Sequence, residues 1–315
     1  MRKSMLNMLA FLVFSLQFLL AFNLTDGSYL QSPSYLFLLV AALISAIRLM
    51  TEMTAYVDAK PNAGSGLKAV VPSIFAMMLV MLWQSLVLGF AVSPVLLPSI
   101  KSIVISFVNN LPLLWADFQQ TYLKAVLAGY VLGCSSGFIV AQLASKSLFL
   151  RNGLLPLGNF MSAIPIVGIA PIMVMWFGFD WQSKAAVIVV MTFFPMFINT
   201  LAGLQSVDHL HQDLLHTYGA SSNQRFVKCQ FFYALPFVFN ALKLNSTLAL
   251  IGAIVAEFFG TPIVGMGFRI STEVGRMNMD MVWATILVAA LAGSLSYGLL
   301  ALLEKRLLFW HPSVR

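Results

Sequence analysis

The residues that could support chemistry gather in one polar segment of an otherwise apolar chain, Asp213–Pro236. It holds charged, histidine and hydroxyl side chains, and long hydrophobic runs flank it on both sides. Charged side chains and unpaired backbone groups are costly in lipid, so such a segment must lie outside the hydrocarbon. No nucleophile and base stand there at a recognisable spacing. We therefore expect a docking element for a partner rather than an enzyme site.

The polar segment has the pattern of two short helices around a glycine turn. Three apolar residues recur at i, i+4 and i+8 and predict one stripe on the first helix: Leu210, Leu214 and Tyr218. Gly219 follows, where a left-handed residue can end a helix. Ser221 and Gln224 match the capping-box pattern that begins a second helix, which carries Arg225 and Lys228. We therefore predict that the two helices form a compact knob.

A second set of polar residues lies within an apolar run. Glu257 is an acid deep in a predicted span, and a carboxylate in lipid is a functional candidate by default. It could instead hydrogen-bond neighbouring backbone or a second subunit, and both interpretations stay open. Asn240, Lys243 and Thr247 can share one helix face at i, i+3 and i+7. We expect that face to meet a translocation pathway or a subunit interface.

Several chemistries are not expected in this chain. Gly64–Lys68 is glycine-rich, but its lysine is displaced from the phosphate-binding pattern and no Ser or Thr follows. ATP hydrolysis, and any cofactor for it, is therefore assigned to a partner. His209 and His211 do not face each other on a helix, so a solvated surface is favoured over a metal site. The basic residues are dispersed, which argues against nucleic-acid binding.

The elements that position these residues are membrane helices. The chain is 60% hydrophobic and 9% charged, whereas soluble domains carry about 25% charged residues. The apolar runs are continuous rather than alternating, which favours helices over a barrel. We expect an all-α integral membrane protein with about eight spans: Met5–Phe22, Ser34–Met50, Leu67–Val92, Thr121–Ala144, Gly153–Phe177, Lys184–Leu204, Phe237–Phe259 and Met281–Leu303.

The first span follows Arg2 and Lys3 as a signal peptide would, but no clear cleavage site is present, so a retained span is favoured. The polar, turn-rich stretch Thr51–Gly66 then separates two spans from the rest. Pro236 should mark the return of the chain to the membrane. The expected parts are an accessory pair with its linker (1–66), a core (67–308) with a polar loop (205–236), and a tail (309–315).

Three segments are not predicted to be simple, uninterrupted spans. Pro165 and Pro171 interrupt Gly153–Phe177, so this span is either a kinked packing helix or one that lines a substrate path. Pro94–Gln120 has helical apolar spacing and predicts an amphipathic helix on the outer surface. Gly260–Asp280 is too polar to span, and predicts an outer loop with one short helix or a re-entrant element.

The distribution of Lys and Arg gives an orientation. With the N-terminus in the cytoplasm, twelve of these residues fall on the inner side of the eight spans and five on the outer side. Cytoplasmic loops carry the excess of positive charge, so both termini are predicted to be cytoplasmic. The polar loop 205–236 then also faces the cytoplasm.

The polar segment resembles the cytoplasmic loop of bacterial ABC-importer permeases, which reads Glu-Ala-Ala, three residues, Gly, nine residues, Ile, one residue, Leu-Pro. Gly219 stands at the family glycine and is followed by the common Ala-Ser. Cys229 stands at the isoleucine, and Asp213 replaces the glutamate. Ala163–Gly178 and Ala256–Gly267 are similar to two stretches of the sulfonate, nitrate and taurine permease subfamily.

The resemblance covers about Leu67–Leu308 and implies a type I importer permease, with six core helices and two extra N-terminal spans. It implies a binding-protein-dependent transporter of the bacterial inner membrane that moves a small polar solute inward by alternating access. The solute would be a sulfonate, nitrate, taurine, or a thiamine- or riboflavin-type heterocycle. The alternatives are an ion-coupled secondary transporter using Glu257 and a non-transporting membrane scaffold.

The resemblance also implies partners. An ATPase subunit would bind ATP and Mg and dock on the polar loop, a solute-binding protein would deliver the solute outside, and a second copy of the chain would complete a homodimer in the lipid. The residues implied in docking are Asp213, Gly219, Ala220, Ser221, Arg225 and Lys228.

Overall fold

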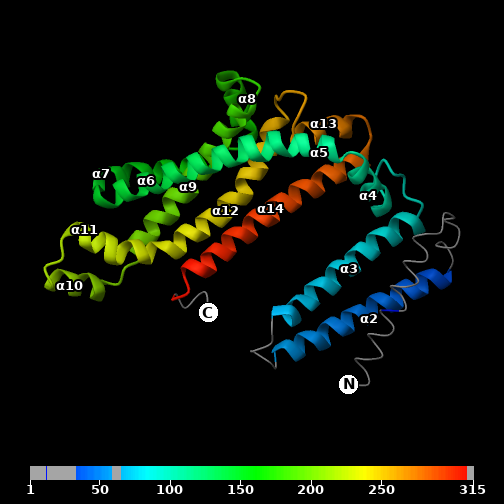
Figure 1. Ribbon diagram of the computed structural model, residues 1–315, viewed down its shortest axis with the longest axis horizontal. Coiled ribbons are helices and arrows are strands. Elements are labelled where there is room, and N and C mark those ends of the chain that lie inside the picture. Colours follow the sequence, from blue (N-terminus) through cyan, green and yellow to red (C-terminus); the bar gives the residue numbers. More distant parts are fainter. Residues whose placement is uncertain (1–11, 13–32, 59–64, 311–315) are drawn as a thin grey trace. The chain divides into compact units, whose positions relative to one another are not determined.

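A computed structural model describes residue 12, residues 33–58 and residues 65–310, and the fold is given for these residues only. Every regular element among them is helical, which confirms the all-α prediction. The chain divides into two compact units, and each is described by itself (Figure 1). The helices of the first unit are α2 (Pro33–Asp58), α3 (Ser65–Gly89) and α4 (Ile100–Asn109).

The second unit holds the remaining elements. They are α5 (Leu111–Phe118), the π-helical η2 (Gln119–Val126), α6 (Leu127–Lys146), α7 (Leu148–Ala163), α8 (Ile166–Phe177), α9 (Trp181–Gln205), α10 (His209–Thr217), α11 (Ser222–Arg225), the π-helical η3 (Phe226–Gln230), α12 (Phe231–Glu257), α13 (Met266–Gly275) and α14 (Met279–Leu307).

Five helices in the described part of the chain are long and apolar enough to cross a membrane: Val70–Gly89, Leu111–Lys146, Trp181–Gln205, Ser222–Glu257 and Met279–Leu307. They correspond to five of the eight predicted spans. The predicted span Met5–Phe22 lies outside the described residues, and Ser34–Met50 falls within α2. The number eight therefore stays a prediction.

The predicted span Gly153–Phe177 is wrong as a single helix, because the structure divides it into α7 and α8. Ile164 ends α7 in an extended conformation (φ −72°, ψ 125°), and Pro165 is the N-cap of α8. A residue before proline is driven out of the helical region, which explains the position of the break. Pro171 lies inside α8 and does not end it.

Two predicted spans lie within helices that begin well before them. The helix that contains Thr121–Ala144 starts at Leu111 and passes through η2, and the helix that contains Phe237–Phe259 starts at Ser222 and passes through η3. Pro236 therefore lies within a continuous helix, and its place at the return of the chain to the membrane stays a prediction. A π-helical turn accommodates an irregularity without ending the helix.

The two shorter predicted helices are present. In the first unit, α4 occupies part of the predicted amphipathic stretch, with Ile103 buried and Val104 exposed. Its N-terminus is tied to α3, because the side-chain oxygen of Gln84 accepts a hydrogen bond of 2.8 Å from the amide of Ile100. In the second unit, α13 is the short helix predicted within Gly260–Asp280.

The core of the second unit forms around α9, which packs against both α6 and α12. Gly129, Gly133 and Gly137 are four residues apart on α6 and face α9. A Cβ atom on Gly129 would lie 2.6 Å from Cβ of Ile188, and one on Gly137 would lie 2.5 Å from the carbonyl oxygen of Phe193. Small residues at this spacing let membrane helices approach closely.

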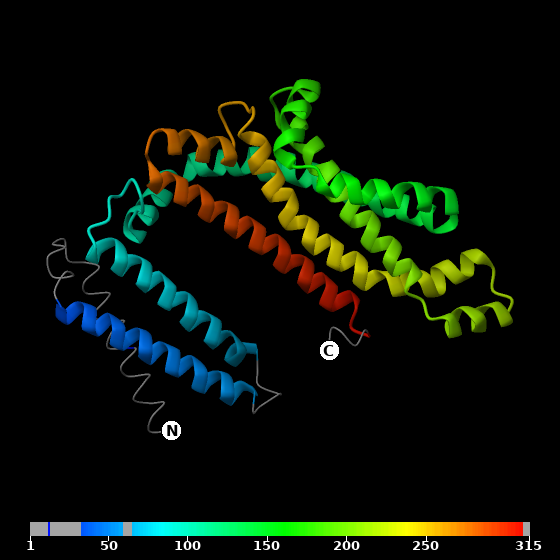
Figure 2. The ribbon, with the colours of Figure 1, turned by 180° about the vertical axis from the view of Figure 1, so that it is seen from behind.

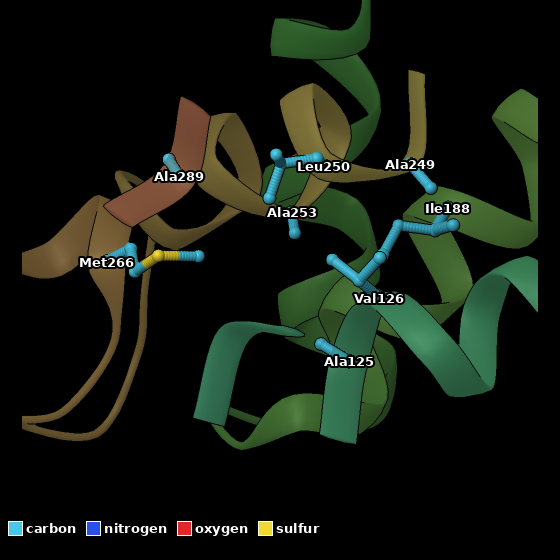
Figure 3. Packing of buried hydrophobic residues seen from close by; sticks show 8 residues of the cluster. All are labelled: Ala125, Val126, Ile188, Ala249, Leu250, Ala253, Met266 and Ala289. Carbon is cyan, nitrogen blue, oxygen red and sulfur yellow. The ribbon is translucent and has the colours of Figure 1, made fainter. Parts of the chain in front are cut away.

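One apolar cluster joins five elements of this unit near the end of α12 (Figure 3). Its buried members come from η2, α9, α12, α13 and α14, and they are Ala125, Val126, Ile188, Ala249, Leu250, Ala253, Met266 and Ala289. Half of them are alanines, so backbones come close together around the cluster. The cluster therefore anchors α13 to the long helices.

Candidate functional site

The polar loop forms the predicted knob, which we define as Asp208–Gln230. The carboxylate of Asp208 caps α10 by accepting a hydrogen bond of 3.1 Å from the amide of Leu210. At the other end of α10, Gly219 has φ +65° and its amide donates to the carbonyl of His216, while Ala220 donates to that of Leu215, both at 2.9 Å. This pair of bonds is a Schellman motif and confirms the predicted glycine turn.

The second arm of the knob begins with the predicted capping box. The hydroxyl of Ser221 accepts from the amide of Gln224 at 3.3 Å, and the side-chain oxygen of Gln224 accepts from the amide of Ser221 at 2.9 Å. This arm continues through η3 into α12 without a break. Figures 1 and 2 show α10 and α11 together at the end of α12 that lies farthest from α13.

The apolar stripe of α10 is uncovered in the chain by itself. Leu210 is 72% exposed, Leu214 is 54% exposed and Tyr218 is 80% exposed. Asp213 and Lys228 are exposed nearby, whereas Arg225 is half-buried and Cys229 is buried. An exposed apolar stripe on a polar, capped helix is typical of protein-interaction surfaces. In the described part of the chain, the histidines of α10 do not join a cluster that could hold a metal.

Glu257 lies at the opposite end of α12 and is buried, with 3% of its surface exposed. One carboxylate oxygen accepts a hydrogen bond of 2.7 Å from the hydroxyl of Thr121 in η2. The other accepts one of 2.6 Å from the amide of Gly267 in α13. Glu257 thus joins three elements, which favours the structural interpretation over an ion site.

Asp117 is the functional candidate that the sequence interpretation missed. It is fully buried in α5, and it accepts hydrogen bonds of 2.8 Å from the amide of Gly265 and from Nε of Arg269. Its only sequence signal is that no other acid occurs between Asp58 and Asp180. Charges buried in a protein need a partner, and this pair supplies one.

Asp117, Thr121, Glu257 and Arg269 together form what we call the α13 latch. Three successive amides at the start of α13 donate to three side chains: Gly265 to Asp117, Met266 to Thr121 at 2.7 Å, and Gly267 to Glu257. These amides have no partner within their own helix, so side chains from α5, η2 and α12 complete it. Glycine at 265 adopts φ +146°, which L side chains rarely do.

The predicted polar face of α12 is not assembled into one site. Asn240 is exposed, and the hydroxyl of Thr247 bonds to the carbonyl of Leu244 in its own helix. Lys243 instead pairs with Glu304 of α14 at 2.6 Å, with both side chains largely buried. This ion pair ties α12 to α14, a contact that the spacing along α12 could not indicate.

Two of the cavities lined by described residues lie in the second unit. The first, of about 210 Å³, is apolar and is lined by Met161, Ile164 and Ile166 at the α7–α8 break and by residues of α9 and α12. Pro165 itself is exposed, and Pro171 is half-buried. A helix break beside a cavity is compatible with a path for solute.

The second cavity, of about 580 Å³, lies between η2, the α8–α9 turn and the α12–α13 loop. Gln120, on η2, connects two charged side chains at its wall: it donates to Asp180 at 2.6 Å and accepts from Lys124 at 3.0 Å. The bonds from Gln120 and from the amide of Trp181 lower the pKa of Asp180, so it stays ionised at neutral pH. Lys184, which is buried, donates to the carbonyls of Phe179 and Asp180 and fixes the turn that carries them.

Comparison with known proteins identifies the class of this fold. Residues 129–309 match the model of the family described as binding-protein-dependent transport system inner membrane component. The formylaminopyrimidine transport permease protein of Halalkalibacterium halodurans is 32% identical over 250 residues, or 78% of this chain and 97% of that protein. The riboflavin transport system permease protein of Chloroflexus aurantiacus is 30% identical over 75% of this chain and 88% of its own length.

The putative aliphatic sulfonates transport permease protein of Bacillus subtilis is also 30% identical, over 75% of this chain and 85% of its own length. The matched family model covers more than half of the chain, including the knob, α12 and α13. This chain therefore belongs to the family of binding-protein-dependent transport system inner membrane components, and it is a membrane permease subunit of an ABC transporter for a small solute.

Proposed function

We propose that two copies of this chain form the pathway of an ATP-driven importer and that each receives a separate ATPase subunit on its knob. As a permease, the chain is a transport subunit rather than an enzyme. The observation that carries the proposal is the uncovered apolar stripe of α10 on an arm that is continuous with α12. ATP and Mg would be bound by the partner, and a solute-binding protein would deliver the solute on the other side.

The knob can transmit force because its second arm is the start of a long helix. Ser222–Glu257 has 36 residues, and at about 1.5 Å per residue it spans roughly 54 Å. A displacement at Ser221 is therefore carried to Glu257 and the α13 latch at the far end. Closure of two ATPase subunits would tilt α12 in both copies and so alternate the access of the pathway. The ion-coupled alternative leaves the uncovered stripe of the knob unexplained.

The substrate is proposed to be a small polar solute. The names of the three relatives specify two chemical kinds, nitrogen heterocycles (formylaminopyrimidine and riboflavin) and aliphatic sulfonates. Both are small enough for a permease that receives one molecule at a time from a binding protein. In this arrangement, the binding protein makes the first selection, and the permease makes a second.

Introduction of a negative charge into the stripe should release the ATPase. Leu214→Glu places a carboxylate in the centre of the apolar contact, and burial of an unpaired charge should reduce ATPase recovery with a tagged permease at least about tenfold. His216→Glu introduces the same charge on another exposed face of α10 and is the matched control. Pull-down from membranes followed by ATPase assay measures the effect. Equal ATPase recovery with both variants would show that the stripe is not part of the contact with the ATPase.

The knob is proposed to face the cytoplasm, with both chain termini on the same side. Cys229 is buried, so it is a poor labelling site, whereas Thr217 is exposed on α10. A Thr217→Cys variant in a Cys229→Ser background should react with an impermeant thiol reagent only after the cells are permeabilised. The parent Cys229→Ser chain is the control for background labelling. Full reaction on intact cells would reverse the assigned orientation and the proposed coupling with it.

A further inference from the structure

We propose that the 580 Å³ cavity beside the α13 latch is a solute site of the permease itself and that it takes an uncharged, planar polar heterocycle rather than a sulfonate or nitrate anion. This inference rests on the proposed function, because it places the site on the side opposite the ATPase knob. It deepens that function by giving the permease its own selectivity.

The size and the setting of the cavity suit a small ligand. Its volume of about 580 Å³ lies within the roughly 300–1,000 Å³ of small-molecule sites. Three elements that are distant in sequence form its walls, represented by Gln119 and Lys124 of η2, Phe179 and Asp180 of the α8–α9 turn, and Val264 of the α12–α13 loop. Lys184 holds the α8–α9 turn in place, and the α13 latch holds the end of the α12–α13 loop. The site is therefore largely preformed.

The two charged side chains of the cavity wall, Lys124 and Asp180, can each form a further hydrogen bond with a ligand. Lys124 donates one hydrogen to Gln120, and an ammonium group has three. The bonds from Gln120 and Trp181 both end on Oδ1 of Asp180, so within the described part of the chain Oδ2 remains available. A cationic donor and an anionic acceptor thus lie on the two sides of one glutamine side chain.

This arrangement selects by charge. A ligand anion would gain the attraction of Lys124 but would meet the ionised carboxylate of Asp180, which is joined to the same bridging amide. An amino-substituted heterocycle avoids this repulsion, because its ring nitrogen can accept from the ammonium while its amino group donates to the carboxylate. Phe179 is 66% exposed at the wall and offers an aromatic face on which a flat ring can stack.

Equilibrium binding to the permease–ATPase complex in nanodiscs, without the solute-binding protein, tests the site directly. The probes are radiolabelled 4-aminopyrimidine and radiolabelled ethanesulfonate. We expect the first to bind at least about tenfold more tightly, and Asp180→Asn to weaken its binding about tenfold, because a hydrogen bond to a charged group is lost. Asparagine is also a good N-cap, so α9 should keep its start.

Lys124→Met should weaken 4-aminopyrimidine binding to a similar extent, whereas Lys101→Met, which removes an exposed lysine that is not in the cavity wall, should not change it. No measurable probe binding, equal affinity for the two probes, or unchanged affinity in the Asp180 and Lys124 variants would each overturn the proposal. If Asp180→Asn weakened only the docking of the solute-binding protein, the cavity would be a protein contact and the proposal would be wrong.

The failure of this inference is distinguishable from the failure of the proposed function. The Leu214→Glu variant should lose its ATPase but keep probe binding, because the knob and the cavity lie at opposite ends of α12. Retained ATPase in that variant would contradict the coupling proposal and leave the binding measurement standing. Normal ATPase recovery in wild type with no probe binding would contradict only the solute site.

Discussion

Replacement of Gly219 by proline should abolish ATP-driven uptake while leaving the protein in the membrane. Gly219 has φ +65°, and its amide donates to the carbonyl of His216. Proline fixes φ near −65° and has no amide hydrogen, so the turn between α10 and the second arm of the knob cannot form. A cost of about 3 kcal/mol or more corresponds to over a hundredfold in any equilibrium that needs the native turn.

Uptake into membrane vesicles and solute-stimulated ATPase activity measure this effect, and the amount of permease in the membrane fraction shows that insertion is intact. Gly219→Ala should give a partial loss, because the added Cβ meets no atom within 4 Å and only the positive φ opposes it. Gly275→Ala is the matched control, since its Cβ also meets nothing but its φ is not positive. Normal uptake by the proline variant would contradict coupling through the knob.

Local signals along the chain were sufficient to predict the knob. The glycine turn at Gly219 and the capping box at Ser221 each depend on residues within a few positions of one another, so their sequence patterns carry most of the information. The apolar stripe of α10 was predicted for the same reason. Such features can be inferred without knowledge of the rest of the fold, and the structure confirms them.

The extents of the long helices could not be predicted in the same way. Hydropathy indicates where lipid surrounds the chain, whereas a helix ends where its backbone hydrogen bonds end. The helix Ser222–Glu257 therefore leaves the apolar run and enters the knob without a sequence signal. Prolines were also ambiguous: Pro165 stands at a helix start, yet Pro171 and Pro236 lie inside helices.

Only part of the candidate site could be predicted from the sequence. The sequence predicts Glu257 as a buried acid, but its partners Thr121 and Gly267 belong to other elements, so the sequence does not specify its role. Asp117 was missed because it follows an apolar stretch with no motif. Lys243 was noted, but its partner Glu304 lies 61 residues away. Pairing across such separations depends on the packing of helices, which no local pattern specifies.

Removal of Asp117 should strongly destabilise the second unit. Asp117→Ala leaves the guanidinium of Arg269 buried, with Glu273 at 3.8 Å as the remaining ion partner, and it leaves the amide of Gly265 without its acceptor. Breaking a buried ion pair by removing one partner costs about 3–5 kcal/mol. Thermal unfolding of the purified protein in detergent measures the loss as a lower Tm.

The double variant Asp117→Leu/Arg269→Met separates the cost of an unpaired buried charge from the loss of the polar contacts between Asp117 and α13. With both charges gone, an apolar pair of similar volume should recover most of the stability, because no uncompensated charge stays buried. Arg276→Ala is the control, since Arg276 is 66% exposed in its pair with Glu273 and should cost less than about 1 kcal/mol. If the double variant were as unstable as Asp117→Ala, the lost contacts between Asp117 and α13, and not an unpaired buried charge, would account for the instability. If it were stable but failed to transport, the polar contacts between Asp117 and α13 would serve the motion of α13 rather than the folding of the chain, because the double variant lacks both the ion pair and the hydrogen bond to Gly265.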